Sequence, residues 1–141
     1  MSFACKICGR DNDDLTHILC LAGIFSRHLN HEYVPNRPEI ITLCGSTRFK
    51  EEINKVNAKL TMQGKLVISL GVFGHIDLPD RDWTTGGSDD KQMLDELHKR
   101  KIDLADRILV VNVGGYIGES TRGEIAYAEA NGKPVDYLEA L

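Results

Sequence analysis

Apolar and polar residues alternate along most of the chain with two different periods, which predict strands and helices in turn. Short apolar runs rich in β-branched residues are typical of buried strands, and four occur, at residues 39–44, 65–70, 107–112 and 134–138. Between them, apolar residues recur at intervals that place them on one helix face; the three series are Phe49, Ile53, Val56 and Leu60, then Leu94, Leu97, Ile102 and Ala105, then Ile125, Ala126 and Ala128. This order predicts an α/β fold of Rossmann-like or flavodoxin-like type, a small parallel sheet with helices on both faces.

The residues before this alternation have a different composition and form a separate segment. Residues 34–39 include two prolines and an asparagine, which predict a turn or linker because each proline disfavours helix geometry in the residue before it. We therefore divide the chain into a Cys/His-rich segment, residues 1–36, and an α/β domain, residues 37–141.

Cysteines and histidines in the first segment have the spacing of metal ligands. A gap of two residues occurs three times, between Cys5 and Cys8, between His17 and Cys20, and between His28 and His31. Two such pairs would complete a tetrahedral zinc site, which would stabilise a segment that has little core of its own. We predict a structural zinc site whose first choice of ligands is Cys5, Cys8, His17 and Cys20; Cys5 and Cys8 with His28 and His31 are the second set, and buried cysteines without metal are the alternative.

Three loops follow the carboxyl ends of predicted strands, where ligands bind in parallel α/β folds. Each is rich in glycine, hydroxyl side chains or both, and they span residues 45–48, 71–90 and 113–123. In the first, Gly45, Ser46, Thr47 and Arg48 lead into a helix, whose N-terminal N–H groups suit a phosphate. An N-cap by Ser46 or Thr47 is the alternative, but it would explain one hydroxyl only.

Glu124 follows the third loop and opens an apolar helix. Thr121 and Glu124 have the spacing of a capping box, in which the carboxylate would only cap the helix. Capping requires none of the glycines that come before it, Gly114, Gly115 and Gly118. A catalytic carboxylate at the ligand edge of the sheet is therefore the competing interpretation.

A resemblance to a known family favours the catalytic interpretation. GEIAYAEANGKPV, residues 123–135, resembles the helix of the nucleoside 2-deoxyribosyltransferase superfamily that carries a nucleophilic glutamate. CGSTRF, residues 44–49, is similar to the first nucleotide-binding loop of that family, and ADRILVV, residues 105–111, to its third strand. The resemblance covers roughly residues 39–141. It implies an enzyme without an organic cofactor that cleaves or transfers the N-glycosidic bond of a nucleoside 5′-monophosphate or nucleoside, and it implies a homo-oligomer.

The resemblance also implies roles for individual residues. Glu124 would be the nucleophile, because a carboxylate below C1′ stabilises a cation-like sugar or forms an ester with it. Ser46, Arg48, Ser120 and Thr121 would contact the 5′-phosphate or the sugar. The full set that we expect to bind substrate is Gly45, Ser46, Thr47, Arg48, His98, Gly114, Tyr116, Gly118, Ser120 and Thr121.

One position departs from the family pattern. Family members place an aspartate that helps to hold the sugar eight residues before the aspartate of the Ala-Asp pair, and here that position is His98. A helical wheel puts His98 on the inward face with Leu94 and Ile102. His98 therefore either replaces the sugar contact or is a core histidine, and both deoxyribonucleotides and ribonucleotides remain open as substrates.

The long loop and the charged helix leave further alternatives. Trp83 either stacks on a base from a lid or only fixes the loop, Tyr116 carries the same ambiguity, and His75 and Asp77 could also reach the site. The charges of residues 91–106 are typical of a solvated helix face.

Charge and hydropathy exclude several other classes of protein. The net charge is −4, with no run of Lys or Arg, which argues against binding to duplex nucleic acid. No apolar stretch approaches the ~20 residues of a membrane span, and no signal peptide opens the sequence, so we expect a cytoplasmic location without membrane contact.

A nucleotide-sensing module that uses the same loops without turnover is the main rival function. A metal-dependent enzyme centred on the first segment is the third.

Overall fold

The computed structural model describes residues 3–5, 33–35, 37–81, 83 and 89–141. The chain divides into two compact units, Met1–Pro38 and Glu39–Leu141. This division lies beside the boundary predicted from the sequence, which stays a prediction.

In the first unit, β1 (Phe3–Cys5) pairs antiparallel with β2 (Tyr33–Pro35). Apart from the backbone of Cys5, the predicted zinc ligands Cys8, His17 and Cys20 lie outside the described residues, as do His28 and His31 of the second set. The zinc prediction for this segment therefore stays a prediction.

The second unit confirms the predicted α/β fold. Its sheet has the order β4-β3-β5-β6 with every pair parallel. The strands are β3 (Ile40–Gly45), β4 (Leu66–Ile68), β5 (Arg107–Val111) and β6 (Val135–Tyr137). The chain runs from β3 to one side of the sheet and then returns to build the other side, so the direction of winding reverses between β3 and β5. Ligands bind at such a switch point, beyond the carboxyl ends of the strands.

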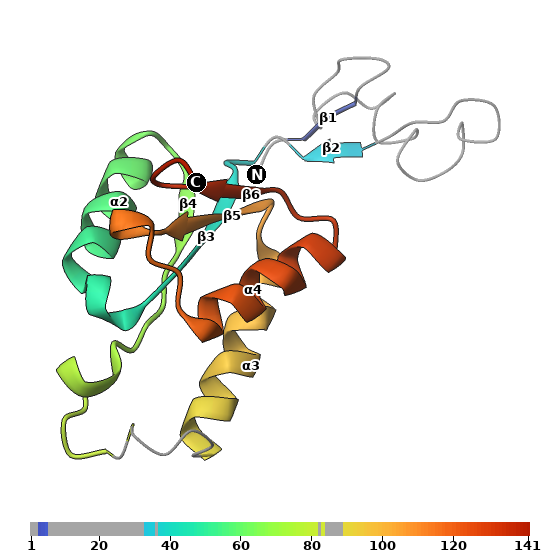
Figure 1. Cartoon of the computed structure of the whole chain (residues 1–141). Coiled ribbons are helices and arrows are strands. Elements are labelled where there is room, and N and C mark those ends of the chain that lie inside the picture. Colours follow the sequence, from blue (N-terminus) through green and yellow to red (C-terminus); the bar gives the residue numbers. More distant parts are fainter. Residues whose placement is uncertain (1–2, 6–32, 36, 82, 84–88) are drawn as a thin grey trace. The chain divides into compact units, whose positions relative to one another are not determined.

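Three helices cover the two faces of this sheet (Figure 1). They are α2 (Lys50–Met62), α3 (Asp89–Leu104) and α4 (Glu119–Ala130). Helix α2 packs on one face, where Ile53 meets Ile41 and Leu43 of β3. Helices α3 and α4 pack on the other face, where Ile102 and Ala128 meet the side chains of Cys44, Ile108 and Val110. Ile41 and Leu43 alternate with Thr42 and Cys44 along β3, as the two-residue period of a strand requires.

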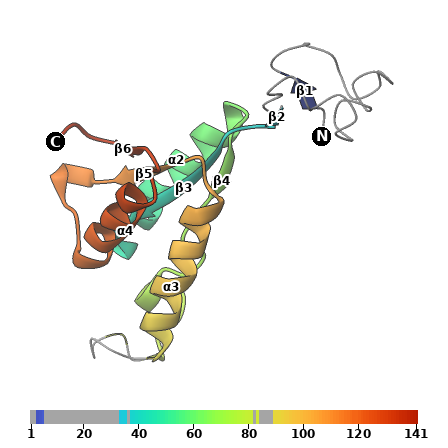
Figure 2. The ribbon, with the colours of Figure 1, turned by 90° about the vertical axis from the view of Figure 1, so that its right-hand side faces the viewer.

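Helices α3 and α4 also contact each other directly (Figure 1, Figure 2). The hydroxyl of Tyr127 on α4 donates to Asp103 of α3 at 2.7 Å, and it accepts from Arg100 at 2.9 Å. These bonds fix the distance between the two helices, which matters because both contribute side chains to the site below.

The start of α4 shows that the capping-box interpretation of Glu124 is wrong. The helix begins at Glu119, with Gly118 at the N-cap and no hydrogen bond from a capping side chain. Thr121 is buried inside the first turn rather than at the cap. Glu124 lies a further turn along the helix, so it does not cap the backbone and a structural role of that kind is excluded.

The loop between β4 and α3 has some structure of its own. A 3-10 turn, η2 (Gly74–Ile76), occupies its first half. The Nε1 of Trp83 donates to the carbonyl of Leu78 at 2.9 Å, and its ring lies edge-on to His75.

Among the described residues, no helix has the length and apolar character needed to cross a membrane.

Candidate functional site

A cavity of about 390 Å³ opens at the carboxyl ends of β3 and β5, between α3 and α4. Most of the predicted site residues line it: Gly45, Ser46, Thr47, His98, Tyr116, Gly118, Ser120, Thr121 and Glu124. Arg48 and Gly114 do not line it. Of the residues left open in the long loop, Trp83 and His75 line the cavity, whereas Asp77 does not and instead pairs with Lys50.

The first loop is shaped by close packing of the two central strands. A Cβ on Gly45 would lie 3.2 Å from the carbonyl oxygen of Val111 and 3.3 Å from its Cβ. Glycine therefore lets β3 approach β5 at the edge of the cavity. Ser46 caps the following turn, η1 (Thr47–Phe49), by accepting from the amide of Arg48 at 3.4 Å. The cap that we considered as the alternative is thus present, and Ser46 also lines the cavity.

We expect Gly45→Ala to destabilise the fold by about 1–3 kcal/mol, because the methyl group would press against Val111 and force the strands apart. Urea unfolding measures the difference. Gly123→Ala is the matched control, since Gly123 lies inside α4 and a Cβ there would meet nothing within 4 Å. That variant should be neutral or more stable than the native protein. A Gly45→Ala variant as stable as the native protein would contradict this account of the loop.

The third loop holds an aromatic side chain at the cavity. Gly114 and Gly115 have φ angles of 62° and 77°, so the turn itself requires glycine there. This explains Gly114 without any ligand. Tyr116 follows, and the guanidinium carbon of Arg48 lies 4.0 Å from the centre of its ring. Arg48 therefore links the first and third loops from outside the cavity.

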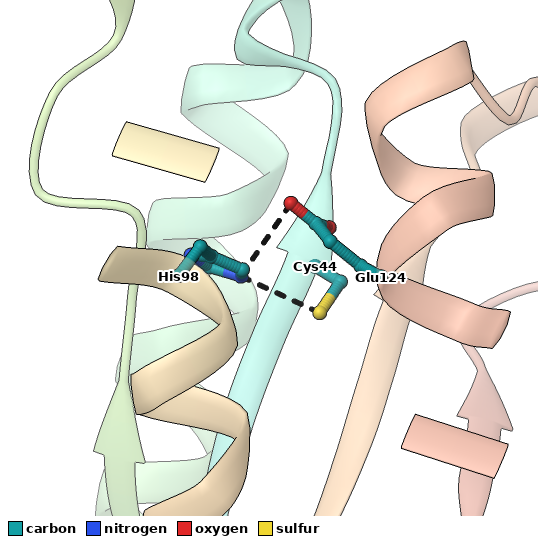
Figure 3. A group of neighbouring side chains, drawn as sticks. All are labelled: Cys44, His98 and Glu124. Carbon is teal, nitrogen blue, oxygen red and sulfur yellow. Dashed lines mark hydrogen bonds and ion pairs between the residues drawn. The ribbon is translucent and has the colours of Figure 1, made fainter. Parts of the chain in front are cut away.

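Side chains from three elements point toward one another beside the cavity: Cys44 from β3, His98 from α3 and Glu124 from α4 (Figure 3). His98 and Glu124 line the cavity, whereas Cys44 is fully buried and does not. The Sγ of Cys44 lies 3.5 Å from Nε2 of His98, and that nitrogen lies 3.9 Å from Oε1 of Glu124. The other oxygen, Oε2 of Glu124, is buried and has no hydrogen-bond partner among the described residues. A buried polar atom in this state costs free energy, so the arrangement calls for a functional reason.

Burial controls the charges of this group. It is the main cause that raises the pKa of Glu124 to about 7; Asp95 adds to the rise, while the Cys44 thiol, Lys91 and Lys101 oppose it. Burial also lowers the pKa of His98 to about 4, with a further contribution from Lys101. His98 is therefore neutral at pH 7, and its contact with Glu124 is not an ion pair under those conditions.

The same group has the donor atoms of a metal site. Cys44, His98 and Glu124 each offer one ligand atom, and these atoms all lie within 4.8 Å of one another. The three side chains could therefore hold a metal ion. The spacing of residues in the sequence does not reveal this group, because Cys44 lies in a predicted core strand far along the chain from His98 and Glu124.

The charged run on α3 contributes side chains that the sequence analysis assigned to solvent. Lys91, Asp95 and Lys101 all line the cavity. The Nζ of Lys91 contacts Asp95 at 2.7 Å and the Oγ of Ser120 at 3.2 Å. Lys101 donates to the backbone carbonyls at the end of β4. The signal that could have found Asp95 and Lys91 is their spacing of three and seven residues from His98, which puts them on its face of the helix.

No protein-family model, curated protein or solved structure matches the chain. The function proposed next therefore rests on the site itself and on the resemblance in its motifs.

Proposed function

We propose that the chain cleaves or transfers the N-glycosidic bond of a nucleoside 5′-monophosphate or nucleoside, with Glu124 as the nucleophile. The observation that carries this proposal is the carboxylate of Glu124. It lies at the floor of a cavity lined by hydroxyl side chains, and one of its oxygens is buried without a hydrogen-bond partner among the described residues. A poorly solvated carboxylate is a strong nucleophile toward an electron-poor sugar carbon.

In the proposed reaction, a carboxylate oxygen of Glu124 bonds to C1′ of the sugar as the C1′–N bond breaks. The electron pair of that bond leaves with the base. Water then attacks C1′, which releases the sugar phosphate and restores the carboxylate, and the proton from this water goes to the base. In a transfer reaction a second base takes the place of water.

The start of α4 supports a phosphorylated substrate. Its first turn is not capped by a side chain, so its N–H groups remain available to an anion where Ser120 and Thr121 meet the cavity. The ammonium group of Lys91, at 3.2 Å from Ser120, adds positive charge at this point. Ser46 and Thr47 provide further hydroxyls at the opposite wall.

Asp95 supports the proposal in a different way. The family's sugar-binding aspartate is replaced here by His98, which contacts Cys44 and Glu124 beside the cavity. Asp95 lies three residues earlier on α3 and also lines the cavity. We propose that Asp95 takes over the contact with the sugar.

A homo-oligomer remains part of the proposal through the family resemblance. Leu97 lines the cavity and is 48% exposed, and Met93 on the same helix is 53% exposed. A second subunit that covered these side chains would close the cavity from the side of α3.

A chromatographic screen for free base tests the function. The native protein, Glu124→Gln and Glu129→Gln are incubated with common ribonucleotides, deoxyribonucleotides and nucleosides. We expect release of a base by the native protein and by Glu129→Gln, whose side chain is exposed on the same helix, and a loss of about a thousandfold or more in Glu124→Gln. Binding of nucleotides without release of any base would instead favour the nucleotide-sensing module.

A further inference from the structure

We propose that Cys44, His98 and Glu124 form a zinc site at the edge of the cavity, which His98 and Glu124 line, with the fourth position of the metal open to an external ligand. The three side chains come from three different elements, β3, α3 and α4, and converge on one point (Figure 3). Tetrahedral zinc holds its S, N and O ligands at about 2.0–2.3 Å, which separates them from one another by roughly 3.3–3.7 Å. The Sγ–Nε2 distance of 3.5 Å meets this requirement, the Nε2–Oε1 distance of 3.9 Å is slightly longer, and all three ligand atoms lie within 4.8 Å of one another. Small movements of the Glu124 side chain would complete the tetrahedral spacing.

The unmet hydrogen-bonding capacity of the group is the second argument. Oε2 of Glu124 is buried and lacks a hydrogen-bond partner among the described residues, although native proteins satisfy nearly all buried polar atoms. A cation bound by the carboxylate, the thiol and the imidazole would offset the charge that Glu124 carries in this buried position. Apolar packing alone gives no reason to bring these three side chains together beside a core whose other buried members are aliphatic, Ile102, Ile108, Val110 and Ala128.

The orientation of His98 is the third argument. Its Nε2 faces both the thiol of Cys44 and the carboxylate of Glu124. A neutral imidazole binds a metal through such a ring nitrogen.

The donor set selects the class of metal. A thiolate and an imidazole suit zinc and related transition metals, whereas magnesium and calcium prefer oxygen ligands only. Three protein ligands leave one position open, as in sites where zinc binds water or an external ligand. This site is separate from the zinc site predicted for the Cys/His-rich segment and uses none of its residues.

Occupation by zinc would also regulate the proposed reaction, and this consequence rests on the proposed function. A metal that takes Glu124 as a ligand withholds the nucleophile from C1′. We therefore expect stoichiometric zinc to inhibit base release and a chelator to restore it.

Cobalt(II) titration of the chelator-treated, reduced full chain tests the site, because a thiolate bound to tetrahedral cobalt gives an intense charge-transfer absorption. The variants are Cys44→Ser, Glu124→Gln and a Cys5→Ser/Cys8→Ser/Cys20→Ser triple variant that removes the three thiols of the N-terminal segment. We expect the triple variant to bind one cobalt with thiolate absorption. Adding Cys44→Ser to it should abolish that absorption, and adding Glu124→Gln should weaken the affinity at least tenfold.

A triple variant without any thiolate–cobalt absorption would overturn the proposal, as would an absorption unchanged by Cys44→Ser. Because Cys44 is fully buried, circular dichroism checks that its variant folds. Glu124→Gln tests the site independently of Cys44. If adding this substitution left the cobalt affinity of the background variant unchanged, that result would also overturn the proposed site. An intact cobalt spectrum without base release by the metal-free protein would support the metal site and contradict only the proposed reaction. Base release at an undiminished rate with zinc bound would contradict the expected inhibition.

Discussion

Replacing Glu124 with glutamine is expected to stabilise the chelator-treated protein at pH 8 while it abolishes base release. The pKa of Glu124 is raised from its ordinary value of 4.5 to about 7. The unfolded chain therefore loses this proton at a lower pH than the folded chain, and the buried carboxylate costs stability as pH rises from 4.5 through 7. Glutamine cannot ionise, so it removes this cost.

The expected gain is on the order of 2 kcal/mol at pH 8, which corresponds to a rise in Tm of roughly 10 °C for a domain of this size. At pH 4 both side chains are neutral, and the gain should vanish. Thermal unfolding at the two pH values measures it, and Glu129→Gln, on the exposed face of the same helix, should change stability by less than about 0.5 kcal/mol at either pH. Equal stability of the native protein and Glu124→Gln at pH 8 would show that burial of the Glu124 carboxylate does not cost the stability that we infer from its raised pKa.

The second large effect is expected at Asn112, which lies between β5 and the third loop. Asn112 is fully buried. Its side-chain amide donates to the carbonyl of Glu139 at 2.8 Å, and its side-chain oxygen accepts from the amide of Glu139 at 2.9 Å. Asn112→Asp would replace the donor with a carboxylate oxygen and place a charge in the core. We expect a loss of about 3 kcal/mol or more in the free energy of unfolding.

Urea unfolding measures this loss, with Asn131→Asp as the control. The amide of Asn131 also donates to a backbone carbonyl, that of Tyr127, but the side chain is exposed at the end of α4. Its replacement should cost less than about 1 kcal/mol. If the two variants lost the same stability, the result would contradict our claim that burial makes the hydrogen bonds of Asn112 more important than those of Asn131.

The fold could be predicted because the segments that form the core have apolar residues at clear helical or strand spacing. Ile53 and its neighbours at helical spacing predicted α2, and the β-branched run at 107–112 predicted β5. The start of α3 was harder to predict. Asp89 and Asp90 open the helix before its first apolar residue, and acidic residues there suit the helix dipole without producing a hydrophobic period.

The site was predicted less completely, because its assembly depends on tertiary contacts. The Thr-x-x-Glu pattern at 121–124 does not reveal whether Thr121 caps a helix or lies inside one, and only the start of α4 at Glu119 decides this. Lys91 and Asp95 have the composition of a solvated face, but α4 lies opposite them and encloses the cavity. Cys44 was part of a predicted strand, and its contact with His98 joins residues far apart in sequence.

The measurement that tests the central claim most directly is base release followed in acid-quenched samples, with the mass of the protein determined in the same samples. Nucleoside 5′-monophosphates are incubated with chelator-treated native protein and with Glu124→Gln. The account predicts free base from the native protein only, and it places any covalently bound sugar phosphate on the peptide that contains Glu124. Base release by Glu124→Gln at the native rate would contradict the claim that Glu124 is the nucleophile.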